Sequence, residues 1–274
     1  MPPITRKDLR YNFLKNIILR LDFQGVFDSE MDCVMRKVKT LAKESGFLKY
    51  EEKTASQIGI TIGDSELLQN CNNTLNRSNK RTYCFINETR GYRLDISSGY
   101  ICMNVNSAHY IPFDEYSKIF ESLITIFRAN IDFFTPKRLG LRKVNECLIP
   151  NKNVIYECFN RDCFCYYDDS NADTIMSNHT DVFNMEPYRI NLISRLDQGK
   201  NIEGDTLYRT QLDIDVYLDA EEDIARVLND EKIQEMNQLT FDIYIHSLNK
   251  NFIEALKSEK DFSFNNIIGV EHNE

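Results

Sequence analysis

The stretch PFDEYSKIFESLITIFRANIDFFTPKRLGLRKVNECLIP, residues 112–150, decides how the rest of the chain can fold. Pro112 suits the first position of a helix, and Asp114 and Glu115 suit its positive N-terminal end. Apolar residues then recur at intervals of three and four: Phe113, Tyr116, Phe120, Leu123, Phe127, Ile131 and Phe134. This spacing predicts a long amphipathic helix with one stripe of side chains in the core.

The second part of this stretch predicts a turn and then a strand. We expect Pro136 to end the helix and Gly140 to turn the chain into a strand over Leu141–Ile149. Around this turn lies a group of polar residues that we call the basic corner: Lys137, Arg138, Arg142, Lys143 and Asn145. Four cations within seven residues could hold a phosphate. In the alternative, the first two complement the C-terminal end of the helix and the last two lie on opposite sides of a strand.

The segments before residue 112 predict a strand, a helix and a meander. Phe13–Phe23 is rich in β-branched and aromatic residues and alternates in its later part, which is typical of a strand with one buried side. A helical pattern begins after Asp28 and stops at Gly46. Three short strands separated by turn residues follow, over Thr82–Glu88, Tyr92–Ile96 and Tyr100–Val105.

The segments after residue 150 predict a hairpin and two helices. Residues 188–197 and 207–219 read as paired strands, followed by helices near Glu221–Leu228 and Glu231–Lys257. We therefore expect an α+β fold of mainly antiparallel sheet flanked by long amphipathic helices. Two halves, residues 1–150 and 151–274, are expected to meet near Pro150 and could be related to each other.

The charge of the chain is unevenly distributed. Its 274 residues carry a net charge of -9, with 42% hydrophobic and 27% charged residues, as in ordinary globular proteins. Residues 1–150 have a balance of +5, and residues 151–274 have a balance of -14. The second half is too acidic to bind nucleic acid, whereas the basic N-terminal half could do so.

Composition also indicates a compartment. No apolar run approaches the roughly 18 residues that span a bilayer, and the first residues do not have the pattern of a signal peptide. We therefore expect a cytoplasmic protein that does not associate with membranes. The eight cysteines are expected to be free thiols in that compartment.

Three groups of residues could carry metal or acid–base chemistry. Four possible zinc ligands lie close together in the sequence: Cys158, Cys163, Cys165 and His179. Their C-x4-C-x-C spacing differs from the usual zinc-binding pairs, and the aromatic residues between them favour a buried segment.

Carboxylates and a histidine form the other two groups. Asp213 and Asp215 share one side of a strand with Asp219, where they could bind a divalent cation or pair with Arg189 and Arg195 across the hairpin. His109 lies in a loop where it could act as a general base. The sequence has no nucleophile elbow and no phosphate-binding glycine loop, so we expect no cofactor and, on balance, no enzyme.

Short motifs in three places resemble one known family. Gly140-Leu141-Arg142 followed by Asn145 is similar to the Gly-Leu-Arg-x-x-Asn strand of a sporadically distributed prokaryotic protein family of unknown function. The family's Tyr-x-x-Trp-x-x-Phe corresponds here to Tyr110, Phe113 and Tyr116, so Phe replaces Trp and Tyr replaces Phe. Its C-terminal signature resembles Leu212-Asp213-Ile214-Asp215 and the last helix with Ser247-Leu248 and Phe252. Families of this distribution are often mobile or defence-associated, so the resemblance implies a role against phage.

Two hypotheses follow. The first is a non-enzymatic protein-interaction subunit, such as an accessory or antitoxin-like component of a prokaryotic anti-phage defence system, with a protein partner encoded by a neighbouring gene. The charge split, the lack of a catalytic constellation and the family resemblance favour it. The second is an RNA-binding or metal-independent RNA-cleaving α+β protein that uses the basic corner and His109.

Overall fold

Nine strands form one antiparallel sheet, in the spatial order β3-β4-β5-β6-β2-β7-β10-β9-β8. The strands are β2 (Leu14–Gln24), β3 (Lys49–Gly59), β4 (Asn76–Asn87), β5 (Tyr92–Ile96), β6 (Tyr100–Val105), β7 (Thr135–Ile149), β8 (Met176–Met185), β9 (Tyr188–Lys200) and β10 (Thr206–Leu218). The computed structural model describes residues 4–59, 76–106, 111–167, 174–230, 232–258 and 271–272. The predicted α+β fold with a mainly antiparallel sheet is confirmed.

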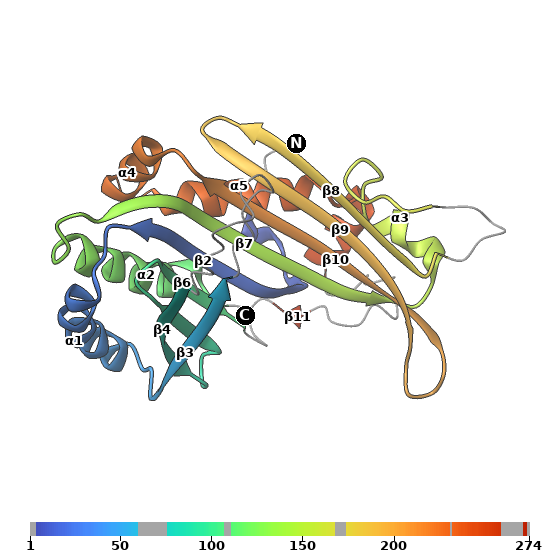
Figure 1. The fold of residues 1–274 in the computed structure, drawn as a ribbon. Coiled ribbons are helices and arrows are strands. Elements are labelled where there is room, and N and C mark those ends of the chain that lie inside the picture. Colours follow the sequence, from blue (N-terminus) through green and yellow to red (C-terminus); the bar gives the residue numbers. More distant parts are fainter. Residues whose placement is uncertain are drawn as a thin grey trace, which may run out of the picture.

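Helices lie against one face of this sheet (Figure 1). They are α1 (Asp28–Glu44), α2 (Phe113–Arg128), α3 (Ile155–Cys158), α4 (Glu221–Asn229), α5 (Ile233–His246) and α6 (Lys250–Lys257), with short 3-10 turns η1 (Arg6–Asp8) and η2 (Lys152–Val154). A separate pair joins β1 (Tyr11–Asn12) to β11 (Glu271–His272). No helix among the described residues is long and apolar enough to span a membrane.

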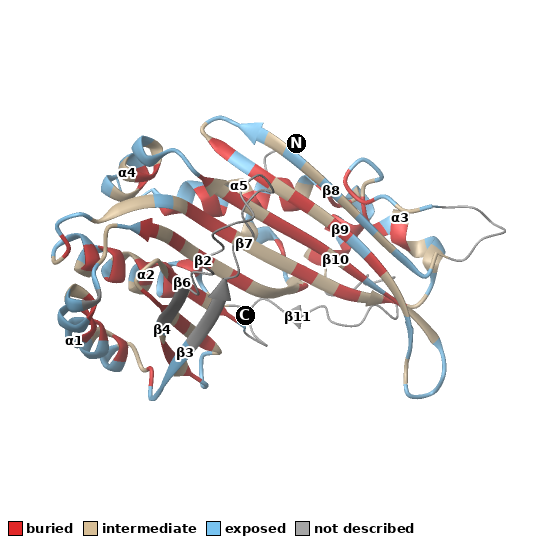
Figure 2. Cartoon of the chain, viewed as in Figure 1, coloured by how far each residue is buried: buried red, intermediate tan, exposed pale blue. Residues whose placement is uncertain are grey.

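Alternation along the strands gives the sheet two different faces. On β2, Leu19 and Leu21 are fully buried under the helices, while Arg20 and Asp22 between them remain partly exposed on the other side. We call this other side the open face. The same alternation produces the bands of buried and partly exposed residues on β2, β7 and β10 in Figure 2.

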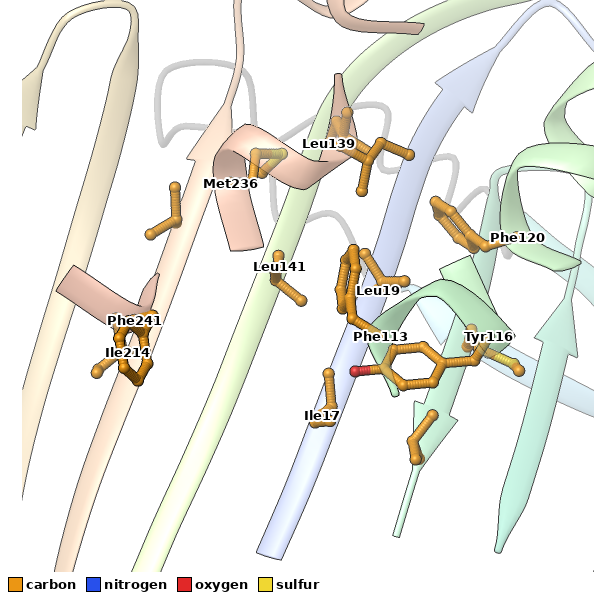
Figure 3. Packing of buried hydrophobic residues seen from close by; sticks show 14 of the residues in the cluster. Ile17, Leu19, Phe113, Tyr116, Phe120, Leu139, Leu141, Ile214, Met236 and Phe241 are labelled. Atoms are coloured by element: carbon orange, nitrogen blue, oxygen red, sulfur yellow. The ribbon is translucent and has the colours of Figure 1, made fainter. Parts of the chain in front are cut away.

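The core is centred where α2 and α5 pack on β2, β7 and β10. Figure 3 shows the side chains that meet there: Phe113, Tyr116 and Phe120 from α2, Met236 and Phe241 from α5, and Ile17, Leu19, Leu139, Leu141 and Ile214 from the strands. Burial of one such large apolar side chain contributes about 1.5–3 kcal/mol. The stripe predicted for α2 therefore does lie in the core as far as Phe127, which is fully buried.

The turn predicted at Gly140 is wrong. The helix ends at Arg128, and β7 runs without interruption from Thr135, so Pro136 and Gly140 are both strand residues. Pro136 is tolerated because it lies opposite Phe23, next to a shift in the β2–β7 register, where a missing N–H disturbs the ladder least.

The single helix predicted over residues 231–257 is also wrong, because α5 and α6 are separate. Between them the chain leaves the helical path to bond with the end of α3. The backbone N–H of Asn249 donates to Cys158 O at 2.9 Å, and its side-chain amide donates to Phe159 O at 3.0 Å. Leu248 also forms an isolated bridge with Phe159. These bonds replace the helical hydrogen bonds that are lost at the break.

Two edge strands were not predicted, and the halves join in one sheet. β3 and β8 lie at the two edges of the sheet, and neither sequence alternates apolar and polar residues as a half-buried strand does. The predicted boundary at Pro150 follows β7 directly. However, β7 pairs along most of its length with both β2 and β10, so residues 1–150 and 151–274 contribute to the same sheet.

Candidate functional site

The basic corner is divided between the two faces of β7. Side chains alternate along a strand, so Arg138 and Arg142 lie on the open face whereas Lys143 and Asn145 lie under the helices. Lys137 is exposed near the end of the strand and forms a 3.2 Å ion pair with Glu221, in the first turn of α4. Because its members lie on different faces, the corner cannot close as a unit around one phosphate.

The two arginines of the corner are held by the two aspartates that were considered as metal ligands. Arg142 binds Asp213 through Nε at 2.8 Å and Nη2 at 2.5 Å, and only 1% of the Asp213 side chain is exposed. This bond raises the pKa of Arg142 above its ordinary value. Arg138 binds Asp215 at 2.8 Å. Burial raises the pKa of Asp215, and the two arginines oppose that shift.

Gly140 leaves space for the second of these pairs. A Cβ atom at this position would lie 2.9 Å from Nη1 of Arg138, so a larger residue would require the guanidinium to shift. The guanidinium crosses Gly140 and lies 4.4 Å from the ring centre of Tyr217 before it reaches Asp215. Asn145 links β7 to β10, since its side-chain amide donates a hydrogen bond to Leu212 O at 3.1 Å.

The remaining predicted site residues do not form a metal centre in the described part of the chain. Asp219 pairs with Arg189 at 2.9 Å, as one prediction allowed. Cys158 and Cys163 are buried and Cys165 is exposed. Across the ranges that the structure describes, no three His, Cys, Asp or Glu side chains are placed to hold one metal ion. His109 lies outside the described residues.

A cavity beside Lys143 is a site that the sequence interpretation missed. It has a volume of about 340 Å³ and lies between α2 and α5 on the helix-covered side of the sheet. Lys143 donates to Asn237 Oδ1 at 2.5 Å, and the Arg6 guanidinium donates to Asn237 O and Gln238 Oε1. The described lining includes no Asp or Glu. The sequence did contain an indication of this site. Every second residue from Leu139 to Asn145 belongs to the buried side of the strand, and Lys143 is one of them.

The electrostatics of this cavity disfavour a charged lysine. Burial, and secondarily the positive charge of Arg6, lower the pKa of Lys143 well below that of an ordinary lysine. The other titratable groups that line the cavity are Lys7, Tyr116 and Tyr244. No carboxylate among the described residues forms an ion pair with Lys143. Its side-chain nitrogen is held by the neutral amide of Asn237 instead.

A second hollow lies beside the edge strand β8. This groove, of about 570 Å³, is bordered by β8, β9, α5 and the segment after α3. Apolar side chains such as Phe183, Leu192 and Ile243 line it, together with Asp162 and Asp242. The described lining also includes Asp181 and His246 but no Lys or Arg, so the groove is acidic.

Comparison with known proteins adds no family. No protein-family model matches the chain, and no curated protein sequence matches it. Among solved structures, it is similar to the S. pombe Pct1 RNA triphosphatase in complex with the Spt5 CTD, with 8% identity and a TM-score of 0.14 over 91% of this chain and 86% of that chain. The S. pombe Pct1 RNA triphosphatase described by itself gives the same identity and TM-score, over 91% and 87%. Similarity this slight supports no conclusion about fold or function, and the family resemblance stays a prediction.

Proposed function

We propose that the chain is a non-enzymatic protein-interaction subunit, and that its partner adds an extended segment to β8. The observation that carries this proposal is the edge strand itself. β8 has ten residues, and among the strands that the structure describes it pairs with β9 alone, without a register shift. A regular edge of this length presents a row of backbone groups to another strand.

The side chains of β8 support this reading because they do not protect the edge. Natural edge strands carry lysine, proline or bulges that prevent pairing with other chains. The opposite edge strand, β3, has exposed charges at Lys49, Glu51, Glu52 and Lys53. On β8, by contrast, Met176 and Val182 are exposed, with 66% of Val182 accessible, and Asp181 is the only carboxylate. Figure 2 shows β8 mostly in the colour of exposed residues.

The acidic groove beside β8 indicates what the partner segment contains. Apolar side chains of the partner would enter between Phe183 and Ile243, where they would be buried away from water. Lysine or arginine residues next to them would face Asp162, Asp181 and Asp242. The occupant is thus an extended segment that alternates apolar and basic residues. The net charge of -14 on residues 151–274 favours the approach of such a partner.

Affinity purification from the native host with its neighbouring gene tests the proposal. We expect wild type to carry a stoichiometric partner and Val182→Lys to lose it, because a lysine protects the edge. The matched control is Ile202→Lys, which makes the same change at an exposed position in the loop between β9 and β10. A wild-type protein that emerges alone and monomeric, or a partner that Val182→Lys retains, would refute the proposal.

A cytoplasmic location and a role in anti-phage defence complete the proposal. The seven described cysteines are free thiols, as expected in a reducing compartment. The defence role follows from the family resemblance. It predicts that phage plate less efficiently on a host that carries the gene and its neighbour than on one with Val182→Lys. Equal plating on both hosts would count against that role.

A further inference from the structure

The cavity between α2 and α5 has one polar end and one apolar end. At the polar end, Lys143 and Arg6 converge on Asn237, which accepts from both through its side-chain and backbone oxygens. Thr240 also lines the cavity. Arg6 is held further by Gln238 and lies 4.5 Å from the ring centre of Phe241. Lys143 thus remains the cation with the least compensation at this end.

The rest of the cavity is apolar and aromatic. Phe113 comes from α2, Phe241 comes from α5, and Ile17 and Ile214 come from the sheet. Figure 3 shows the Phe113 ring beside β2 and the Phe241 ring beside β10, with β7 between them. Lys143 Nζ lies 5.8 Å from the ring centre of Phe113, at the limit of a cation–π contact. A few polar groups at one end of an apolar cavity are typical of a site that orients a small ligand.

We propose that this cavity binds a small monocarboxylic acid with an aliphatic or aromatic body, whose carboxylate pairs with the ammonium group of Lys143. Lys7 is exposed to water, and the Arg6 guanidinium already donates to Asn237 O and Gln238 Oε1. The ammonium group of Lys143 is thus the principal partner for an anion, and one such cation matches one negative charge better than two. The volume of about 340 Å³ is near the lower end of the range for ligand pockets, about 300–1,000 Å³, so the acid is small. This site lies on the helix-covered side of the sheet and is separate from the edge strand β8.

Charge pairing gives the binding its selectivity. An ammonium group surrounded by apolar side chains without a carboxylate is costly, and a bound carboxylate supplies the missing partner. Burial lowers the pKa of Lys143 in the empty site, whereas a bound anion favours its protonated form. Arg6 and Lys7 from the N-terminal segment favour the anion as well. Tyr116 from α2 and Tyr244 from α5 also line the cavity, and burial raises the pKa of Tyr244 well above its ordinary value. Binding is therefore expected to take up a proton at mildly alkaline pH.

Isothermal titration calorimetry with octanoate, octanol and octylammonium tests this proposal. We expect octanoate to bind wild type best, because the three probes share a chain and differ in charge. Lys143→Met keeps the apolar stem and removes the ammonium, so octanoate should bind about tenfold or more weakly and lose its advantage over octanol. Lys137→Met, an exposed position on the same strand, is the matched control and should bind as wild type does.

Two results would overturn the proposal. One is wild type binding octanol or octylammonium as well as octanoate, and the other is Lys143→Met binding octanoate like wild type. If Lys143→Met does not fold, the test uses wild type alone. Titration in buffers of different ionisation enthalpy at mildly alkaline pH measures how many protons the protein takes up when the ligand binds. Proton uptake with octanoate and none with octanol supports the pairing, and equal uptake or no uptake for both contradicts it.

Discussion

Removal of the Arg142 guanidinium should destabilise the protein far more than an ordinary surface substitution. Its partner Asp213 has 1% of its side chain exposed and accepts two hydrogen bonds from Arg142, at 2.8 and 2.5 Å. In Arg142→Met this carboxylate would stay buried without a cation. Such broken pairs cost about 3–5 kcal/mol, because desolvation of the remaining charge is no longer offset.

Two further variants test whether the buried carboxylate causes this loss. Arg20→Met is the matched control, since it breaks another arginine–aspartate pair on the open face whose aspartate, Asp22, is 28% exposed. That loss should not exceed about 1 kcal/mol, because water can hydrate the remaining carboxylate. Adding Asp213→Asn to Arg142→Met should restore part of the stability, since it removes the unpaired charge.

Equilibrium unfolding in urea measures all of these free energies. The total stability of a domain is about 5–15 kcal/mol, so a loss of the expected size is easily resolved. The reasoning is refuted if Arg142→Met loses no more than Arg20→Met. It is also refuted if Asp213→Asn gives no recovery in the Arg142→Met background.

Three other predictions follow from single positions. Gly25→Ala should cost more than about 2 kcal/mol in urea unfolding, because Gly25 has a φ of +84° and a Cβ atom would lie 1.8 Å from Phe133 O. Burial lowers the pKa of Lys143, so the unfolded chain binds the extra proton. The stability cost of Lys143 is complete below its folded-state pKa and is lost as the pH rises to its unfolded value. Urea unfolding at rising pH should therefore show the stability advantage of Lys143→Met over wild type shrink and vanish near about pH 10.4. Burial raises the pKa of Cys147 to about 12, so mass spectrometry after brief alkylation should find Cys165 modified and Cys147 unmodified until the protein unfolds.

Periodicity in the sequence could predict which residues are buried better than where elements end. The apolar stripe of α2 and the hairpin of β9 and β10 are found where their spacing predicts them. The break between α5 and α6 could not be predicted, because it depends on bonds from Asn249 to residues about ninety positions earlier. The edge strand β8 was missed for a related reason. Its burial alternates between exposed and half-buried residues, but polar residues such as Ser177, His179 and Asp181 occupy the half-buried positions, so the sequence has no apolar alternation to detect.

The candidate sites were harder to predict than the fold, because their partners are distant in the sequence. Arg142 and Asp213 are 71 residues apart, and only the pairing of β7 with β10 brings them together. Proximity in sequence indicated one cluster of cations. On a strand, however, neighbouring residues such as Arg142 and Lys143 lie on opposite faces. The alternation that placed Leu139 and Leu141 in the core could have placed Lys143 beside them.

The motif that carries the family resemblance is accounted for by the pairing of β7 with its neighbours. Gly140 gives Arg138 space, Leu141 fills the core, Arg142 neutralises Asp213, and Asn145 bonds to β10. Each of these roles stabilises the sheet, and none of them requires a ligand or a partner. Lys143, within the same motif, makes no such contribution, because burial penalises its charge. A residue that costs stability beside a cavity is a better indication of function than the motif that surrounds it.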